Sequence, residues 1–269
     1  MSEALRDLGE GLVLRRGRAA DAEALAAFNA DVLRPQDATE PNATMAAWTR
    51  DLFTGRHPTF TPDQATVVEH RPSGAIVSSA LLISQTWSFA GVPIRVGQPE
   101  LVGTHIDYRG RGLVRAQFEV LHRWSADRGH QLQAIAGIPW FYRQFGYELA
   151  LARGGGPAVP ISNLIPLPRQ DSPAYRFRPL REEDLDFAVD LDTHACARSL
   201  MTVPRDAGLW RYELMGRSAD SAIRQEMRII ESAEGDPVGL LTHAPRLSGV
   251  RFDVTGWELK PGVSWSVPS

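Results

Sequence analysis

The order of apolar and polar residues predicts a strand followed by a helix at the start of the chain. Residues 12–14 form a short apolar run, and Asp21 stands where a helix N-cap is expected. After Asp21, apolar residues recur at the spacing of one helix face: Ala24, Leu25, Phe28 and Leu33. Residues 35–62 are rich in Pro, Thr, Asn and Asp, which predicts loops around a short second helix near 45–53.

The next part of the chain is strand-like. Two apolar runs, at 65–69 and 74–89, are joined by the turn sequence HRPSG, and a hairpin then leads back to a strand at 99–105. Apolar runs of this length, bounded by Gly and Pro, are typical of buried strands. The sequence therefore predicts a sheet whose strands are joined by short turns.

An amphipathic helix is predicted over 113–128. Its apolar residues fall on one face, and Gly129 stands where a C′ glycine ends a helix: the face consists of Val114, Phe118, Leu121 and Trp124. Three short elements are expected after it, a strand at 131–136, a helix at 139–145 and a strand at 147–152.

The second part of the chain repeats the beginning of the first. Residues 154–173 contain three consecutive glycines and five prolines, which is typical of a linker. The segment 175–191 then aligns without gaps on 12–28, and three charged residues coincide: Arg178 with Arg15, Arg181 with Arg18 and Asp184 with Asp21. We therefore expect a first lobe at 1–155, a linker at 156–174, and a partial second copy at 175–269.

Composition and charge narrow the class of protein. The 269 residues are 43% hydrophobic and 23% charged with a net charge of −3, as in ordinary globular domains and unlike a basic nucleic-acid binder. The single cysteine, Cys196, excludes an intrachain disulfide and fits a reducing compartment. No signal-peptide pattern and no apolar run of roughly 18 residues is found. We therefore expect a cytoplasmic protein with neither a nucleic-acid nor a membrane partner.

Two glycines and several arginines surround the start of the predicted helix at 113. A helix start offers free backbone N–H groups, and Gly110 and Gly112 let an anion come close to them. The stretch lacks the Gly-Lys-Ser/Thr of a Walker loop, and Arg115 stands where a dinucleotide fingerprint needs its third glycine. It is also not a repetitive arginine–glycine tract. A plain turn is the alternative to an anion site.

The stretch resembles the acetyl-CoA pyrophosphate loop of the GCN5-related N-acetyltransferases (GNAT). The family pattern Arg-x-x-Gly-x-small is met by residues 109–114, although Val114 is bulkier than the usual Gly or Ala. The string FYRQFGYE at 141–148 is similar to the family's fourth helix and following strand. The resemblance implies a mixed α/β sheet with the GNAT acyl-CoA N-acyltransferase fold, followed by a partial second GNAT-like lobe. The tandem lobes most resemble the Eis-type enzymes, whose third, sterol-carrier-like domain has no counterpart here.

The resemblance implies roles for particular residues. Acetyl-CoA, as cosubstrate, would be held by residues that pair with its pantetheine arm or surround its pyrophosphate: Val102, Gly103, Thr104, Arg109, Gly110, Arg111, Gly112, Leu113, Val114 and Arg115. Tyr142 matches the family's general acid, with a core aromatic as the alternative reading. Glu100 lies where some members keep a general base, with a structural carboxylate as the alternative. His105, water, or an amine that arrives neutral remain other routes for deprotonation.

The acceptor and the partners are less well defined by the sequence. Candidate walls and cation-attracting acids of an acceptor pocket lie in the 35–62 segment and the hairpin: Asp37, Glu40, Trp48, Trp87 and Phe89. No His or Cys cluster has metal-ligand spacing, so no metal is expected. We expect an N-acetyltransferase that acts on a primary amine of a small molecule or peptide by direct attack in a ternary complex. The alternative is a regulatory module that binds acetyl-CoA without catalysis, and the second lobe could mediate homo-oligomer formation through an open sheet edge.

Overall fold

The computed structural model describes residues 4–151, 175–245 and 253–263, which form two compact units. The first unit comprises the chain up to residue 153 together with 216–223, and the second comprises the remainder. The expected linker at 156–174 lies outside the described residues. Each unit has its own sheet and hydrophobic core.

The sheet of the first unit has the strand order β1-β2-β3-β4-β5-β6. Neighbouring strands are antiparallel except β5 and β6, which are parallel. The strand bounds are β1 Ala4–Gly9, β2 Leu12–Arg16, β3 Ala65–His70, β4 Ala75–Phe89, β5 Val92–Thr104 and β6 Leu132–Gln133. The helix bounds are α1 Ala22–Val32, α2 Ala43–Phe53, α3 Leu113–Asp127 and α4 Pro139–Tyr142.

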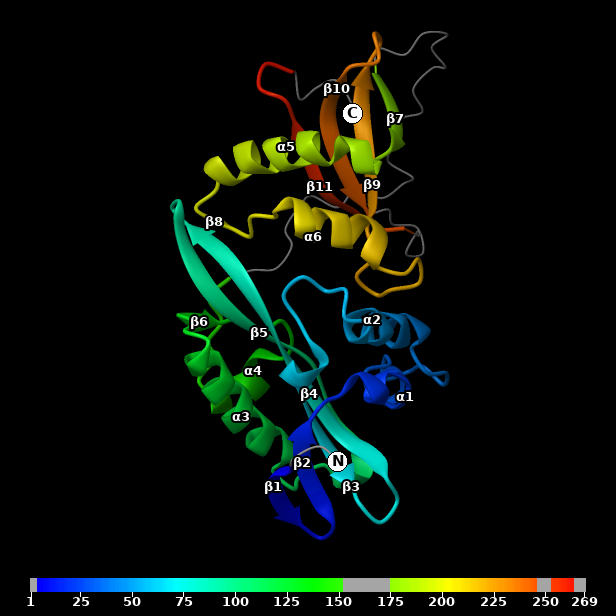
Figure 1. Cartoon of the computed structure of the whole chain (residues 1–269), viewed down its shortest axis with the longest axis vertical. Coiled ribbons are helices and arrows are strands. Elements are labelled where there is room, and N and C mark those ends of the chain that lie inside the picture. The colour runs from blue at the N-terminus through cyan, green and yellow to red at the C-terminus, as the bar shows by residue number, and fades with distance from the viewer. Residues whose placement is uncertain (1–3, 152–174, 246–252, 264–269) are drawn as a thin grey trace. The chain divides into compact units, whose positions relative to one another are not determined.

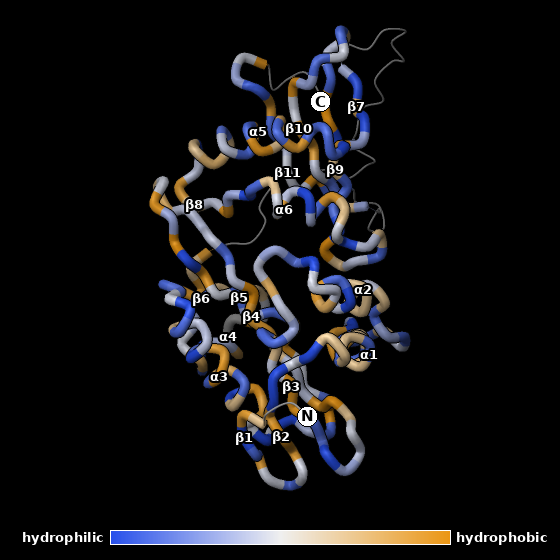
Figure 2. The backbone as a smooth tube through the Cα atoms, in the orientation of Figure 1, coloured by the Kyte–Doolittle hydropathy of each residue, from blue (hydrophilic) through white to orange (hydrophobic). Residues whose placement is uncertain are grey.

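Helices cover both faces of this sheet, α3 on one side and α1 with α2 on the other (Figure 1). The alternation of side chains along a strand explains the two cores, because Leu81 packs with α1 and α2 while Leu82 packs with α3. Polar and apolar residues alternate along α3 in Figure 2, as expected of an amphipathic helix. The predicted mixed α/β sheet is therefore confirmed.

Three features of the first unit differ from the sequence-based expectation. β1 was not predicted, because its residues are mostly exposed and lack an apolar pattern. The strand expected at 131–136 is only two residues long. Residues 147–151 form no strand, since Leu149 and Leu151 are exposed and no strand within residues 4–151 pairs with them. Alternation alone therefore misled the prediction where a neighbouring strand is lacking.

The second unit repeats the first unit's opening. Its antiparallel sheet has the order β11-β10-β9-β7, which corresponds to β5-β4-β3-β2. The bounds of its strands are β7 Tyr175–Pro179, β9 Glu226–Ser232, β10 Pro237–His243 and β11 Val254–Leu259. The two-residue strand β8, Met201–Thr202, is not part of this sheet. The helix bounds are α5 Leu185–Ala197 and α6 Ala207–Arg211, and a π-helical turn spans Tyr212–Gly216.

The repeat extends to a buried ionic network. In the first unit Arg15 donates to both carboxylate oxygens of Asp21, at 2.7 and 2.9 Å, and to Glu69 at 2.7 Å. In the second unit Arg178 makes the same bonds to Asp184 and Glu231. These charges tie β2 and β7 to the helix that follows each of them and to the neighbouring strand, β3 or β9. The Arg and Asp residues that align between the two halves of the sequence thus form the same ion pair in both units.

A short segment from the second half of the chain belongs to the first unit. The backbone N–H of Ser218 donates to Asp51 at 3.0 Å, and that of Ala222 donates to the carbonyl of Thr44 at 3.0 Å. Ile223 packs against the core beneath α2. The sequence prediction, which placed all residues after 174 in one second lobe, did not foresee this return.

Candidate functional site

The regular pairing between β4 and β5 is interrupted at Leu101. Ser79 pairs with Gly103 whereas Leu81 pairs with Glu100, so β5 carries one more residue than β4 over this interval. Leu101 itself has a φ of 49°, in the left-handed region that non-glycine residues rarely adopt. A bulge of this kind redirects the side chains of a strand, and Glu100 is placed directly beside it.

A buried polar network holds the bulge in place. The Ser79 hydroxyl lies 3.2 Å from the carbonyl oxygen of Leu101 and 3.0 Å from Oδ1 of Asn29. Asn29, on α1, also donates through Nδ2 to Thr49 on α2 at 3.1 Å. Because all three side chains are buried, this network fixes an otherwise unfavourable backbone conformation.

Ser78 supports the end of β5 from the opposite face. Its hydroxyl lies 2.9 Å from the carbonyl oxygen of Gly103 and 2.7 Å from Oε1 of Gln117, which is fully buried on α3. Sequence reasoning missed these supporting residues. The available signal was two adjacent serines inside the apolar run 75–83, because buried hydroxyl groups need hydrogen-bond partners.

One edge of β5 is left open beyond Gly97. β6 pairs with β5 only at Val96 and Gly97, and no described strand pairs with that side of residues 98–104. The predicted pantetheine-binding residues Val102, Gly103 and Thr104 lie along this half-buried stretch. An extended amide-containing chain could therefore hydrogen-bond to the open edge as an additional strand would.

The glycines before α3 form an open backbone cradle. Gly110 and Gly112 have φ values of 75° and 73°, and a Cβ at either position would meet no atom within 4 Å. Gly112 is the N-cap of α3 but offers no side-chain hydrogen bond, and the first helical bond runs from Ala116 N–H to the Gly112 carbonyl. The N–H groups of the first turn therefore lack helical partners, as in known anion sites.

The three arginines at this cradle are exposed and differ in direction. Each guanidinium has a partner within the first unit: Arg109 Nε donates to Thr104 O at 3.3 Å, Arg111 to Glu10 at 2.8 Å, and Arg115 to Gln144 Oε1 at 3.0 Å. Arg115 therefore reaches toward the segment after α4, whereas the other two contact β5 and the β1–β2 turn.

Tyr142 is the last residue of α4 and lies against α3. Its ring stacks on Phe118 with a centroid distance of 6.0 Å, and a Cβ at Gly137 would lie 3.0 Å from its Cε2 atom. Burial raises the pKa of Tyr142, and the negative charge of Glu100 raises it further. The phenol is therefore neutral at physiological pH and can donate a proton.

Glu100 thus belongs to the same site as Tyr142. Its carboxylate is half-buried next to the bulge and accepts a hydrogen bond from Nε2 of Gln98. A neutral phenol and a carboxylate in one partly desolvated site can act as an acid and a base. These two predicted catalytic residues are brought together by the fold.

Three of the predicted acceptor residues, Trp48, Trp87 and Phe89, do not line a pocket beside this pair. Trp48 is 8% exposed and packs in the core between α2 and the sheet. Trp87 and Phe89 lie six and eight residues along β4 from Leu81, the partner of Glu100, which is about 20 and 26 Å of strand. The remaining two candidates, Asp37 and Glu40, are exposed in the loop between α1 and α2.

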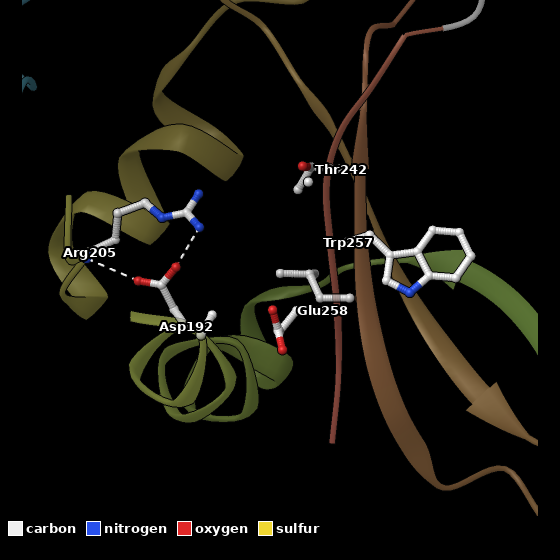
Figure 3. A pocket seen from close by; sticks show the side chains of 8 residues that line it. Asp192, Arg205, Thr242, Trp257 and Glu258 are labelled. Carbon is white, nitrogen blue, oxygen red and sulfur yellow. Dashed lines mark hydrogen bonds and ion pairs between the residues drawn. The ribbon is translucent and has the colours of Figure 1, made fainter. Parts of the chain in front are cut away.

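The second unit contains a small cavity between α5 and the sheet (Figure 3). Its volume is about 170 Å³, and its lining is mixed: Asp192, Ala195, Arg205, Leu240, Thr242, Gly256, Trp257 and Glu258. The charged groups already have partners, since Asp192 accepts from Arg205 at 2.6 Å and Glu258 from Arg198 at 2.7 Å. The cavity therefore has no charge that requires a ligand.

Two classes of site are not found in the part of the chain that the structure describes. None of its helices has the length and apolar character required to cross a membrane. No three His, Cys, Asp or Glu side chains are grouped so that they could hold a metal ion.

Comparison with known families identifies the first unit. The profile of the acetyltransferase (GNAT) domain matches residues 14–150, just over half of the chain. The chain belongs to the GNAT family. The bulge on β5, the cradle before α3 and Tyr142 all lie inside the matched region. The GNAT fold binds acyl-CoA, so the first unit carries an acyl-CoA-binding fold.

Solved structures confirm the GNAT fold over most of the chain. A probable N-acyltransferase from Enterococcus faecalis V583 matches with a TM-score of 0.61 and 14% identity over 92% of this chain. A GCN5-related N-acetyltransferase from Kribbella flavida matches with a TM-score of 0.59 and 15% identity over 93%. The chain spans 58% and 57% of these two proteins. The match therefore includes the second, smaller lobe.

A further fold match is to a protein with a bound long-chain acyl-CoA. Saccharomyces cerevisiae N-myristoyltransferase with bound myristoyl-CoA matches with a TM-score of 0.63 and 11% identity, covering 96% of this chain and 68% of that protein. No curated protein matches the sequence.

Proposed function

We propose that the first unit transfers an acetyl group from acetyl-CoA to a primary amine. The observation that carries the proposal is the placement of Tyr142 and Glu100 in one site beside the β5 bulge. The pantetheine arm would pair with the open edge of β5, and the pyrophosphate would lie over the N–H groups after Gly112. The cofactor's thioester would then reach the bulge beside Glu100, and Tyr142 would act there as the general acid.

The proposed reaction is direct transfer within a ternary complex. The neutral amine attacks the thioester carbonyl, so that a C–N bond forms and the C–S bond breaks. The amine gives up one proton, which Glu100 takes directly or through water, and Tyr142 donates one proton to the leaving sulfur. The raised pKa of Tyr142 keeps the phenol protonated before transfer.

We further propose that the second unit is a degenerate lobe without its own cofactor, as in the Eis-type enzymes. Its sheet and its ionic network copy the first unit. The cavity between α5 and the sheet carries ion pairs in place of free donors.

Calorimetry and a thiol-release assay test this function. Acetyl-CoA should bind, and free thiol should appear with at least one member of a panel of polyamines, aminoglycosides and lysine peptides. Myristoyl-CoA in parallel reactions tests the choice of acyl chain. Binding without thiol release from any amine would support a cofactor-binding module instead, and absence of binding would refute the proposal.

Substitution of the proposed general acid provides a second test of the function. Tyr142→Phe should lower kcat about 100-fold or more while acetyl-CoA affinity stays unchanged, because only the transferred proton is lost. Tyr175→Phe, in β7 of the second unit, is a matched control that should leave kcat unchanged. Turnover by Tyr142→Phe at the wild-type rate would remove Tyr142 from the mechanism.

A further inference from the structure

The Tyr147 hydroxyl joins three elements behind Tyr142. It donates to Oε1 of Gln133 on β6 at 2.5 Å and lies 3.3 Å from Nε2 of His122 on α3. The Tyr147 ring also contacts Phe118, the residue on which Tyr142 stacks, with a centroid distance of 5.9 Å. The hydroxyl is thus the point where β6, α3 and the segment after α4 are hydrogen-bonded together.

The backbone between the two tyrosines forms a tight return. A short 3-10 turn, Arg143–Phe145, follows Tyr142, and Gly146 then adopts a left-handed conformation with a φ of 88°. This turn brings the N–H of Tyr147 to the carbonyl oxygen of Tyr142 at 3.3 Å, and the two rings lie 6.2 Å apart. Because the two residues share this hydrogen bond and ring contact, a displacement of Tyr147 would also displace Tyr142.

The side chains hydrogen-bonded at the Tyr147 hydroxyl are uncharged. Burial raises the pKa of Tyr147, and the neighbouring Tyr142 raises it further. Burial also lowers the pKa of His122. Tyr147 therefore keeps its proton and gives it to Gln133 in a hydrogen bond, while its oxygen can accept the Nε2–H of a neutral His122.

We propose that Tyr147 is a positioning residue, whose hydroxyl anchors the Tyr142 segment to β6 and α3 and so fixes the phenol of Tyr142 in the site. This inference rests on the proposed role of Tyr142 as the general acid. The hydroxyl of Tyr147 is bound to Gln133, so Tyr147 acts through its neighbour and does not supply the transferred proton.

Kinetics of four variants and one control test the anchor. Tyr147→Phe and Gln133→Leu should each lower kcat about 10-fold with the KM for acetyl-CoA changed less than about 2-fold, because orientation and not binding is lost. The double variant should be no slower than either single variant, since both remove the same hydrogen bond. Gln133→Glu keeps an acceptor oxygen and should restore most of kcat, and Tyr175→Phe again serves as the control.

Hydrogen–deuterium exchange gives a readout that does not depend on turnover. In Tyr147→Phe, amides of the peptide 139–147 should exchange several-fold faster, while those of α3 keep their protection. Unchanged exchange, or additive losses of kcat in the double variant, would overturn the anchor. A chain that shows the exchange change but acetylates no amine would refute the proposed function and leave the structural anchor standing. If Tyr147→Phe lowered kcat as far as Tyr142→Phe, Tyr147 would act as an acid and the proposal would be wrong.

Discussion

Replacement of Gly112 by Ala tests whether the turn before α3 is an anion cradle or a plain turn. Gly112 has a φ of 73°, where an L-residue is disfavoured by about 1–2 kcal/mol. A new Cβ would meet no atom within 4 Å, so collision adds nothing to this cost. The free energy of unfolding of the first unit should therefore fall by about 1–2 kcal/mol, whichever role the turn has.

Coenzyme A affinity separates the two roles. In a cradle, any relaxation of φ at the N-cap turns the free N–H groups away from the pyrophosphate, so we expect the affinity to fall about 10-fold or more. Gly55 provides the matched control, because its φ is 74° and its surroundings are equally open. Gly55→Ala should lose similar stability in urea unfolding and keep its affinity in calorimetry. Equal affinities in the Gly112 and Gly55 variants would refute the cradle.

Three further predictions concern stability and the direction of Arg115. Arg15 has 8% of its side chain exposed and Arg178 has 25%. Arg15→Met should therefore lower the free energy of unfolding of the first unit by about 3 kcal/mol, and Arg178→Met should lower that of the second unit by less. Equal losses in urea unfolding would contradict this prediction. Arg115→Met should weaken acetyl-CoA binding less than 2-fold in calorimetry, since its guanidinium is held by the segment after α4; a 10-fold loss would make it a phosphate ligand. Burial, followed by the charge of Arg217, lowers the pKa of His57 to about 4, so the unfolded chain takes up a proton that the folded chain does not bind between pH 6.5 and 4. The free energy of unfolding should fall across that range by at most about 3 kcal/mol, and His57→Leu should flatten the profile; an unaltered profile would exclude His57 as the cause.

The sequence predicted those features that depend on local pattern. The apolar periodicity placed α1, α2 and α3 within one or two residues of their observed bounds. These predictions succeeded because a helix face is determined by a few neighbouring residues.

The supports of the site could not be predicted in this way. Ser79 acts through Asn29, fifty residues away, and Ser218 reaches Asp51 across 167 residues. Sequence separation of this size leaves no periodic signal, so only the fold reveals the contact. The strand predicted at 147–152 does not form over the described residues 147–151, for a related reason. A strand is stabilised by pairing with a neighbouring strand, and alternation of apolar and polar residues does not show whether such a neighbour exists.

The duplication helps to separate residues that fold the chain from residues that build the site. The Arg15 network occurs in both units, which assigns it to folding. Asn29, which fixes the bulge through Ser79, is replaced 163 residues later by Asp192, and Asp192 is bound to Arg205. The same helix position thus supports the sheet bulge in the first unit but forms an ion pair in the second. A copy that keeps the scaffold network but not the bulge support can fold without holding a thioester, and this physical difference explains why we place the chemistry in the first unit alone.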